Sequence, residues 1–315
     1  MEYSNDNTTN RFVLLGLADT PINQAFCVLI FLIIYTLTLS GNCLLIIAVR
    51  INSRLQTPMY FFLSNLSVID IGFSSCIVPK LLLITLAHDK SVSLLECAVQ
   101  IFFHLGLGGA ECMILAVMAY DRYAAICKPL HYNRIMNKGF CICMAAGLWM
   151  VSFISSGVHV KFAYHLPFCR FHHVDHFFCE IPPLLKLSCE DPWINPTAQY
   201  ITIIVYFISI IAMCSFFLTL ISYVHIISTI LRIRSIEGRH KAFSTCTSHL
   251  TVVSIYYSTV MFMYLHLSST YLPNTNKVAS IIYTTVIPML NPIIYSIRNK
   301  DVKHTIKMKL AFCKM

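Results

Sequence analysis

Long apolar runs alternate with short polar segments along the whole chain. Seven of these runs are long enough to cross a bilayer as an α-helix, which takes about 20 residues. Each run is continuous, whereas the strands of a membrane barrel are about 10 residues long and alternate apolar with polar positions. The pattern therefore predicts an all-α membrane protein, a bundle of seven transmembrane helices. The expected helices cover residues 26–49, 59–86, 98–120, 140–163, 197–227, 243–265 and 272–296.

The composition supports a membrane environment for these runs. Of the 315 residues, 57% are hydrophobic and only 12% are charged, whereas a soluble domain carries about 25% charged residues. A soluble globule of this size would leave much of that apolar surface exposed to water. In a membrane, lipid rather than water contacts this apolar surface.

Lys and Arg are distributed unequally between the two sides of the expected membrane. Of the 23 basic residues, 16 fall on one side, and cytoplasmic segments are the ones enriched in Lys and Arg. We therefore expect an extracellular N-terminus (residues 1–25), a transmembrane bundle (26–296) and a cytoplasmic tail (297–315). The net charge of +9 reflects this topology, and no nucleic-acid partner is expected, because the basic residues are split among separate segments. The 16 residues are Arg50, Arg54, Arg122, Lys128, Arg134, Lys138, Arg232, Arg234, Arg239, Lys241, Arg298, Lys300, Lys303, Lys307, Lys309 and Lys314.

The two ends of the chain carry signals that fit this orientation. Asn7-Thr8-Thr9 is an acceptor for N-linked glycosylation on the outer side. In the tail, Val302, Ile306 and Leu310 recur at every fourth position with lysines between them. This spacing predicts a short amphipathic helix on the inner leaflet, with membrane lipid as its partner.

Four cysteines are expected on the oxidising outer side, where two disulfides should form. Four cysteines allow three pairings, and their spacing does not choose among them. They are Cys97, Cys169, Cys179 and Cys189.

Two carboxylates lie inside expected transmembrane helices, where ionisable residues are costly and often functional. Asp70 is in the second helix and Glu111 is in the third. If they are close together, they should not both ionise without compensation. One hypothesis is a sodium or proton site, and the other is a structural hydrogen-bond network with Asn42 and Asn291. In the seventh helix, prolines on either side of Asn291 predict a distortion, and Asn291 is expected to satisfy the backbone groups that they free.

Catalytic signatures are missing from the sequence. It contains no glycine-lysine phosphate loop, no His-Glu-x-x-His zinc helix and no Gly-x-Ser-x-Gly elbow. The outer loop is rich in His and Cys, but the spacing matches no standard zinc pattern. We therefore expect no enzyme and no metal or cofactor, apart from a sodium ion at Asp70 and Glu111. The residues of the loop are His165, Cys169, His172, His173, His176 and Cys179.

A charged pair, Asp121-Arg122, interrupts the apolar pattern near the end of the third helix. The pair fits two interpretations: side chains that snorkel to water at a helix end, or a switch read by a cytosolic partner. The Asp-Arg-Tyr motif of residues 121–123 and the Asn-Pro-x-x-Tyr motif of residues 291–295 resemble those of rhodopsin-like G-protein-coupled receptors. The stretches PMYFFLSNLSVIDI (58–71), MAYDRYAAICKPLHY (118–132) and KAFSTCTSHLTVV (241–253) resemble, more specifically, vertebrate olfactory receptors of class II.

The resemblance implies a disulfide between Cys97 and Cys179 and another between Cys169 and Cys189. It implies a plasma-membrane protein of olfactory neuron cilia, which binds a small volatile odorant and activates the stimulatory olfactory G protein to raise cyclic AMP. Arg122 would meet the G protein once it is released from Asp121. The residues of this switch are Asp121, Arg122, Tyr123, Tyr223, Asn291, Pro292 and Tyr295.

The odorant is expected in the outer half of the bundle. The residues placed there are mostly apolar, with a few hydroxyls and one imidazole, which suits a small neutral or weakly polar molecule. Glycines at 106, 108 and 109 of the third helix leave room either for a ligand or for close helix packing. The expected ligand contacts are His104, Leu105, Gly108, Phe207, Ile211, Tyr257, Val260, Met261, Tyr264 and Thr284.

Two other functions fit parts of the sequence. A rhodopsin-like receptor for a non-odorant small molecule, expressed outside the nose, would carry the same switch motifs. A transporter or channel would use Asp70 and Glu111 as a proton path, but the odd number of helices and the missing internal repeat argue against it.

Overall fold

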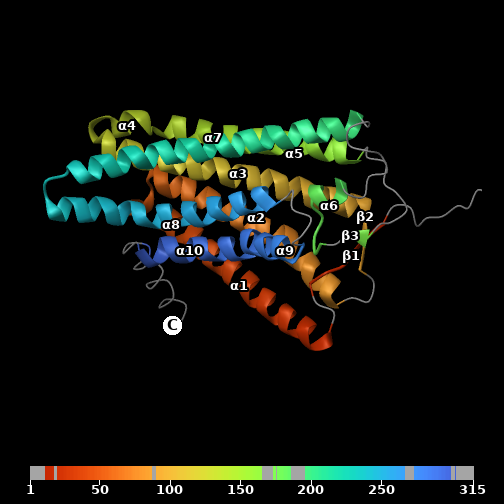
Figure 1. Cartoon of the computed structure of the whole chain (residues 1–315). Helices are drawn as coiled ribbons and strands as arrows, with labels where there is room; N and C mark the ends of the chain where they lie inside the picture. The colour runs from red at the N-terminus through yellow and green to blue at the C-terminus, as the bar shows by residue number, and fades with distance from the viewer. Residues whose placement is uncertain are drawn as a thin grey trace, which may run out of the picture.

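In the computed structural model, long helices run side by side in one elongated bundle (Figure 1). The structure describes residues 11–17, 20–86, 90–164, 173–174, 176–185, 196–266, 273–298 and 302. Seven helical segments match the seven apolar runs, and the predicted all-α bundle is confirmed. They are α1 (Pro21–Ile51), α2 (Pro58–Leu86), α3 (Leu94–Cys127), α5 (Lys138–Tyr164), α7 (Pro196–Arg232), α8 (Ile236–His266) and a last helix made of α9 (Pro273–Ile281), η3 (Ile282–Val286) and α10 (Ile287–Arg298).

Among the described residues, six helices combine the length and the hydropathy of a membrane span. The remaining long helix, α8, carries Ser, Thr and His residues within its apolar run, and several of its side chains lie outside the described part. Capping residues fix two of the helix starts: Thr20 accepts a hydrogen bond from the Asn23 amide at 3.4 Å, and Ser93 and Glu96 form a capping box at the start of α3. These caps satisfy backbone donors that have no partner inside the helix.

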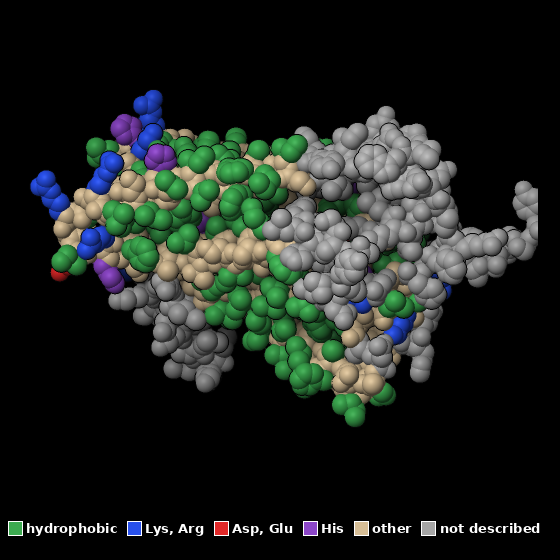
Figure 2. Space-filling view, in the orientation of Figure 1, with side chains coloured by type: hydrophobic (Ala, Val, Ile, Leu, Met, Phe, Trp, Pro, Cys, Tyr) green, Lys and Arg blue, Asp and Glu red, His purple; other side chains and the backbone are tan. Residues whose placement is uncertain are grey.

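The helix α3 lies at the centre of the bundle and packs against α2, α5, α7 and α8. Apolar side chains cover the middle of the outer surface in Figure 2, and Lys and Arg gather at the end where α7 meets α8. The exposed apolar residues include Phe26, Leu32 and Leu218, which are 64%, 49% and 60% exposed. A belt of this kind needs lipid rather than water around it.

A small sheet, which was not predicted from the sequence, covers the end of the bundle where α3 begins. After the orientation expected from the sequence, we call this end the outer end and the end where α3 finishes the inner end. The central strand β1 (Arg11–Leu14) pairs antiparallel with β2 (Ser91–Ser93) and parallel with β3 (His173–Val174). Phe12 and Leu14 of β1 are buried in the same cluster as Cys97 and Cys179. The disulfide between Cys97 and Cys179 is present, as the family resemblance implied. The N-terminal segment therefore holds two outer loops together.

The last helix is distorted before its prolines, as predicted, but a different asparagine satisfies the freed carbonyl. The π-helical turn η3 ends one residue before Ile287, and Pro288 follows. Pro292 has no N–H to donate to the Pro288 carbonyl, and the Asn42 amide of α1 donates to it instead at 3.0 Å. The Asn291 amide donates to Asp70, so the role expected for Asn291 was wrong.

The glycines of α3 serve two faces of the helix. A Cβ atom at Gly106 would lie 2.9 Å from the Phe153 ring of α5, and one at Gly109 would lie 3.3 Å from the Ser152 hydroxyl. These two glycines therefore allow close packing of α3 on α5. A Cβ atom at Gly108 would lie 2.7 Å from the Tyr283 hydroxyl, on the side of the expected ligand.

Some sequence predictions lie outside the described residues. They are the glycosylation acceptor Asn7, the pair Cys169 and Cys189, and the amphipathic tail helix beyond Val302. Val302 itself is fully buried against the bundle.

Candidate functional site

The charged pair at the inner end of α3 is buried and hydrogen-bonded within the protein. Arg122 donates to the Asp121 carboxylate through Nη2 and, at 3.0 Å, through Nε. Tyr132, on the short helix α4 (Tyr132–Ile135), donates to the other carboxylate oxygen at 2.8 Å. The Asp121 side chain is fully buried and that of Arg122 is 13% exposed. A pair that merely snorkels to water does not fit this burial.

The loop that carries Tyr132 is therefore tied to the charged pair. Burial and the negative charge of Asp121 both raise the pKa of the Tyr132 phenol, so the hydroxyl keeps its proton and remains a donor. Tyr123 follows Arg122 directly in α3, and its ring is 5.8 Å from that of His225 and 5.9 Å from the Lys128 ammonium. The inner end of α3 thus contacts both the loop and α7.

Tyr223 and Tyr295, which the family resemblance assigns to the same switch as Arg122, form no hydrogen bond with Arg122 in the described part of the chain. The Tyr223 hydroxyl is 2.6 Å from Nδ1 of His249, and the two rings stack with centroids 5.8 Å apart. The Tyr295 hydroxyl is buried, and it has no hydrogen-bond partner among the described residues. His249 was missed by the sequence analysis, although a histidine inside an apolar run was the signal that could have found it.

The two membrane carboxylates lie near each other, but only one of them is paired. The Asn291 amide donates to both oxygens of Asp70 at 3.1 Å. Asp70 is close enough to Glu111 for the two charges to interact. Both carboxylate oxygens of Glu111 are buried and have no hydrogen-bond partner in the described part of the chain. Asn42 bonds to backbone carbonyls, so it does not extend this network to Asp70.

The chemistry of these groups fits a small cation or a shared proton. Burying an ionised carboxylate without a partner is expensive, and a bound cation or a proton removes most of that cost. Carboxylate and amide oxygens are suitable ligands for hard cations. Glu111 supplies two such oxygens, and Asp70 is held in place by Asn291.

At the outer end, aromatic rings surround His104 of α3. Its ring centroid is 5.0 Å from that of Phe73, 5.1 Å from that of Phe178 and 6.4 Å from that of Tyr283. His104 is 8% exposed, and its Nδ1 has no hydrogen-bond partner among the described residues. Together these residues form an aromatic cage with one polar atom that a ligand could engage.

The outer loop is anchored directly above this cage. Phe178 precedes Cys179, whose disulfide to Cys97 holds the loop on α3. The Cys179 amide also donates to the Gln100 side chain at 2.9 Å, and the Gln100 amide donates to the Cys76 carbonyl at 3.0 Å. Because its sulfur is in the disulfide, Cys179 is not a thiolate ligand for the metal considered from the sequence. Residues 165, 169 and 172 of that loop lie outside the described residues.

The other expected ligand contacts separate into groups. Gly108 faces the cage, whereas Leu105 packs on the buried cluster around the disulfide. Tyr257 is buried, with its hydroxyl 3.9 Å from the Cys112 sulfur. Thr284 is fully buried, and its hydroxyl donates to the Ser280 carbonyl at 2.7 Å.

The remaining expected contacts are either half-buried or outside the described side chains. Half-buried positions are Ile211, Val260 and Met261, and the side chains of Phe207 and Tyr264 lie outside the described part.

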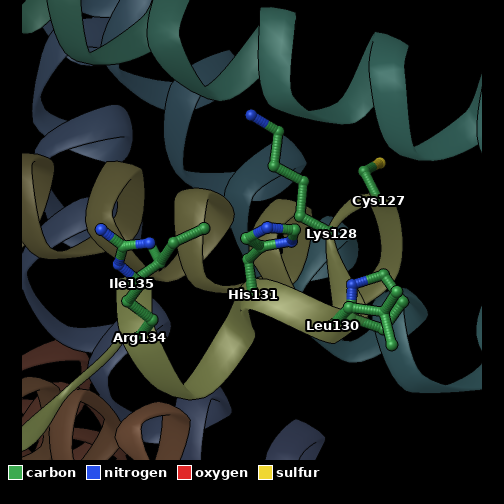
Figure 3. Close-up of a pocket in the computed structure, with 7 residues that line it drawn as sticks. Cys127, Lys128, Leu130, His131, Arg134 and Ile135 are labelled. Atoms are coloured by element: carbon green, nitrogen blue, oxygen red, sulfur yellow. The ribbon is translucent and has the colours of Figure 1, made fainter.

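A groove of about 650 Å³ opens at the inner end, beside the loop that carries Tyr132 (Figure 3). Leu130, in the short 3₁₀ helix η2 (Pro129–His131), is 96% exposed at its edge. The groove has no signature in the sequence, because its shape depends on the loop conformation. The groove is lined by Cys127, Lys128, Pro129, Leu130, His131, Arg134 and Ile135.

Comparison of the sequence with known proteins identifies relatives of this chain. A family model described as olfactory receptor matches residues 31–313. The human protein Olfactory receptor 5B12 is 46% identical over 310 residues, which cover 98% of this chain and 97% of the relative. The mouse protein Olfactory receptor 5AP2 is 45% identical over 98% of this chain and 95% of the relative. The dog protein Olfactory receptor-like protein OLF1 is 46% identical over 96% of each chain.

Proposed function

Because this chain belongs to the olfactory receptor family, a family of G-protein-coupled receptors and not of enzymes, we propose that it couples a volatile ligand to the stimulatory olfactory G protein. Ligand binding in the outer half of the bundle would raise cyclic AMP through the inner end. The observation that carries the proposal is the buried pair of Arg122 and Asp121 at the inner end of α3. The cage around His104 lies near the opposite end of the same helix.

The proposed odorant is small, neutral or weakly polar, and it binds beside His104. Nδ1 of His104 can accept or donate one hydrogen bond, and the rings around it favour an apolar body. An ion would have to shed its water among these rings, which is costly without an opposite charge. Gly108 is the proposed neighbour of the ligand in the cage, and Tyr257 is the proposed neighbour beneath the cage. Further proposed contacts are Leu105, Phe207, Ile211, Val260, Met261, Tyr264 and Thr284.

We place the N-terminus outside the cell and the end with Arg122 in the cytosol, in the plasma membrane of olfactory neuron cilia. The support is the excess of Lys and Arg at that end. In the active state, the proposed partners of a released Arg122 are Tyr223 and Tyr295. A sodium ion at Asp70 and Glu111 is the proposed counter-ion of the resting state.

The test is a cyclic AMP assay in cells against a chemically diverse odorant library, with surface staining as the expression control. At least one neutral odorant should raise cyclic AMP, and His104→Phe should weaken that response at equal surface level. Current evoked by the same odorants in cells without any G protein would contradict the proposal. A full response from His104→Phe would contradict the proposed position of the ligand beside His104.

A further inference from the structure

The groove at the inner end lies where two transmembrane helices meet the loop after α3. It runs from Cys127, the last residue of α3, to Ile135, the last residue of α4. The Cys127 sulfur is 3.2 Å from the Thr229 hydroxyl of α7, so this edge of the loop lies directly beside α7. A groove in this position opens toward the headgroup region of the inner leaflet, given the orientation proposed above.

Positive charge dominates the lining of the groove. Two of its seven lining residues, Lys128 and Arg134, are basic, a third is His131, and none is acidic. Lys128 and Arg134 extend on the same side of the loop, with the His131 ring between them in this view (Figure 3). Within the described part of the chain, neither Lys128 nor Arg134 forms an ion pair with a carboxylate. The groove therefore presents two permanent positive charges that are available to an anionic ligand.

The remaining lining residues supply an apolar edge. Pro129, Leu130 and Ile135 border the basic residues, and Leu130 is 96% exposed. A groove that is cationic inside and apolar at its edge matches an anionic lipid, whose phosphates adjoin its acyl chains. Basic pockets between transmembrane helices on the cytoplasmic side bind phosphoinositide headgroups. A soluble phosphate compound has no use for the apolar edge.

We propose that this groove binds the headgroup of a phosphoinositide of the inner leaflet. Lys128 and Arg134 contact its phosphates, and Leu130 lies among the upper acyl carbons. The assignment rests on the proposed orientation but not on the identity of the odorant. Tyr132 lies on the same loop and donates to Asp121, so the lipid also holds in place the loop that contacts the charged pair.

The proposal is tested by lipid binding to the purified full-length receptor, which requires no odorant. Native mass spectrometry measures the dissociation constants of phosphatidylinositol bisphosphate, phosphatidylserine, phosphatidylcholine and soluble inositol trisphosphate. The bisphosphate lipid should bind about 10-fold or more tightly than phosphatidylserine. Equal binding of the two lipids, or equally tight binding of soluble inositol trisphosphate, would overturn the assignment.

Variants then locate the site on the receptor. Lys128→Gln combined with Arg134→Gln should weaken binding of the bisphosphate lipid about 10-fold or more, since each basic residue near a membrane contributes about a factor of five. The control is Arg50→Gln combined with Arg54→Gln, which removes the same charge from two exposed residues at the same end and should change binding less than 2-fold. Lys128→Arg combined with Arg134→Lys should bind like the wild type, which separates loss of charge from loss of fold.

The competing occupant is the G protein itself. It would be favoured if the Lys128→Gln, Arg134→Gln receptor bound the lipid normally but failed to stimulate nucleotide exchange in nanodiscs of pure phosphatidylcholine. That result would overturn the lipid proposal and leave the proposed receptor function intact. A receptor that binds the lipid through these two residues and yet responds to no odorant would support the lipid proposal and contradict the proposed receptor function.

Discussion

The contacts of single residues show how the inner end of the bundle is held. Arg122 is bound by its neighbour Asp121, and Tyr132 shares the same carboxylate. Removing one partner of a buried ion pair leaves the other charge uncompensated, which makes such pairs hard to break without a replacement. A partner that enters from the cytosol and offers new contacts to Arg122 provides that replacement. The pair therefore suits a switch better than a simple helix end.

Arg122→Ala should abolish odorant-evoked cyclic AMP. The variant lacks the cation that the G protein is proposed to meet, whereas Asp121 keeps its hydrogen bond from Tyr132. The measurement is cyclic AMP per receptor at the cell surface, with Arg54→Ala, an exposed arginine at the same end, as the control. If the Ala variant is retained inside the cell, Arg122→Gln keeps a donor for Asp121 and takes its place. A normal response at equal surface level would show that Arg122 is no switch.

Tyr223 and His249 allow a second test at the scale of one hydrogen bond. His249→Phe keeps a stacked ring but removes the ring nitrogen that is hydrogen-bonded to the Tyr223 hydroxyl. A typical hydrogen bond contributes about 1 kcal/mol, so basal cyclic AMP should rise about 5-fold as Tyr223 becomes free for Arg122. Tyr223→Phe should instead lower the odorant-evoked maximum without raising basal activity. Basal shifts in the same direction for both variants would exclude this role for the bond.

At the scale of helices, close packing of α3 on α5 sets the centre of the bundle. Gly106 faces the Phe153 ring, and Trp149 of α5 donates to the Asn65 side chain of α2 at 3.1 Å. These contacts join three helices through side chains that fit only at short distance. Small residues at such interfaces permit the close approach.

Gly106→Ala should lower the thermal stability of the purified receptor. Its new Cβ atom would lie 2.9 Å from the Phe153 ring, and overpacking of this kind costs about 1–3 kcal/mol. Gly147→Ala is the matched control, because nothing lies within 4 Å of its Cβ position. That control should be neutral or slightly stabilising, since Ala is favoured over Gly inside helices. Thermal unfolding in detergent measures both, and equal stability of the two variants would contradict tight packing at Gly106.

At the scale of the whole molecule, the sequence is sufficient to predict the bundle but not its cross-connections. Continuous apolar runs are a strong signal, because a bilayer requires helices of a minimum length. The sheet was missed because β1 pairs with strands roughly 80 and 160 positions away, and each strand is too short to show a period. The bond between Tyr223 and His249 depends on how α7 and α8 are rotated against each other. Periodicity alone does not determine that rotation.

The candidate site, like the fold, was predictable from the sequence only in part. Asp70, Glu111 and Asp121 were found because charged residues are rare in membrane helices. Their partners were predicted less well: Asn291 joins Asp70, but Asn42 bonds to the Pro288 carbonyl because the prolines reshape the last helix. Contacts between helices depend on such local distortions. Residue types alone therefore identify candidates, and only the fold pairs them.

The cluster of Asp70, Glu111 and Asn291 joins α2, α3 and α10, so an ion bound there would stabilise the whole bundle. Sodium should raise the thermal unfolding temperature of the purified receptor relative to an equal concentration of N-methylglucamine. At ten times its dissociation constant, a ligand adds about 1.4 kcal/mol to stability. Glu111→Gln should abolish the sodium effect, because it removes the unpaired carboxylate and leaves the bond between Asn291 and Asp70 intact. Glu237→Gln, at an exposed position of α8, should leave the effect unchanged. If the wild type ignores sodium but becomes more stable as the pH falls, a shared proton holds the two carboxylates together instead.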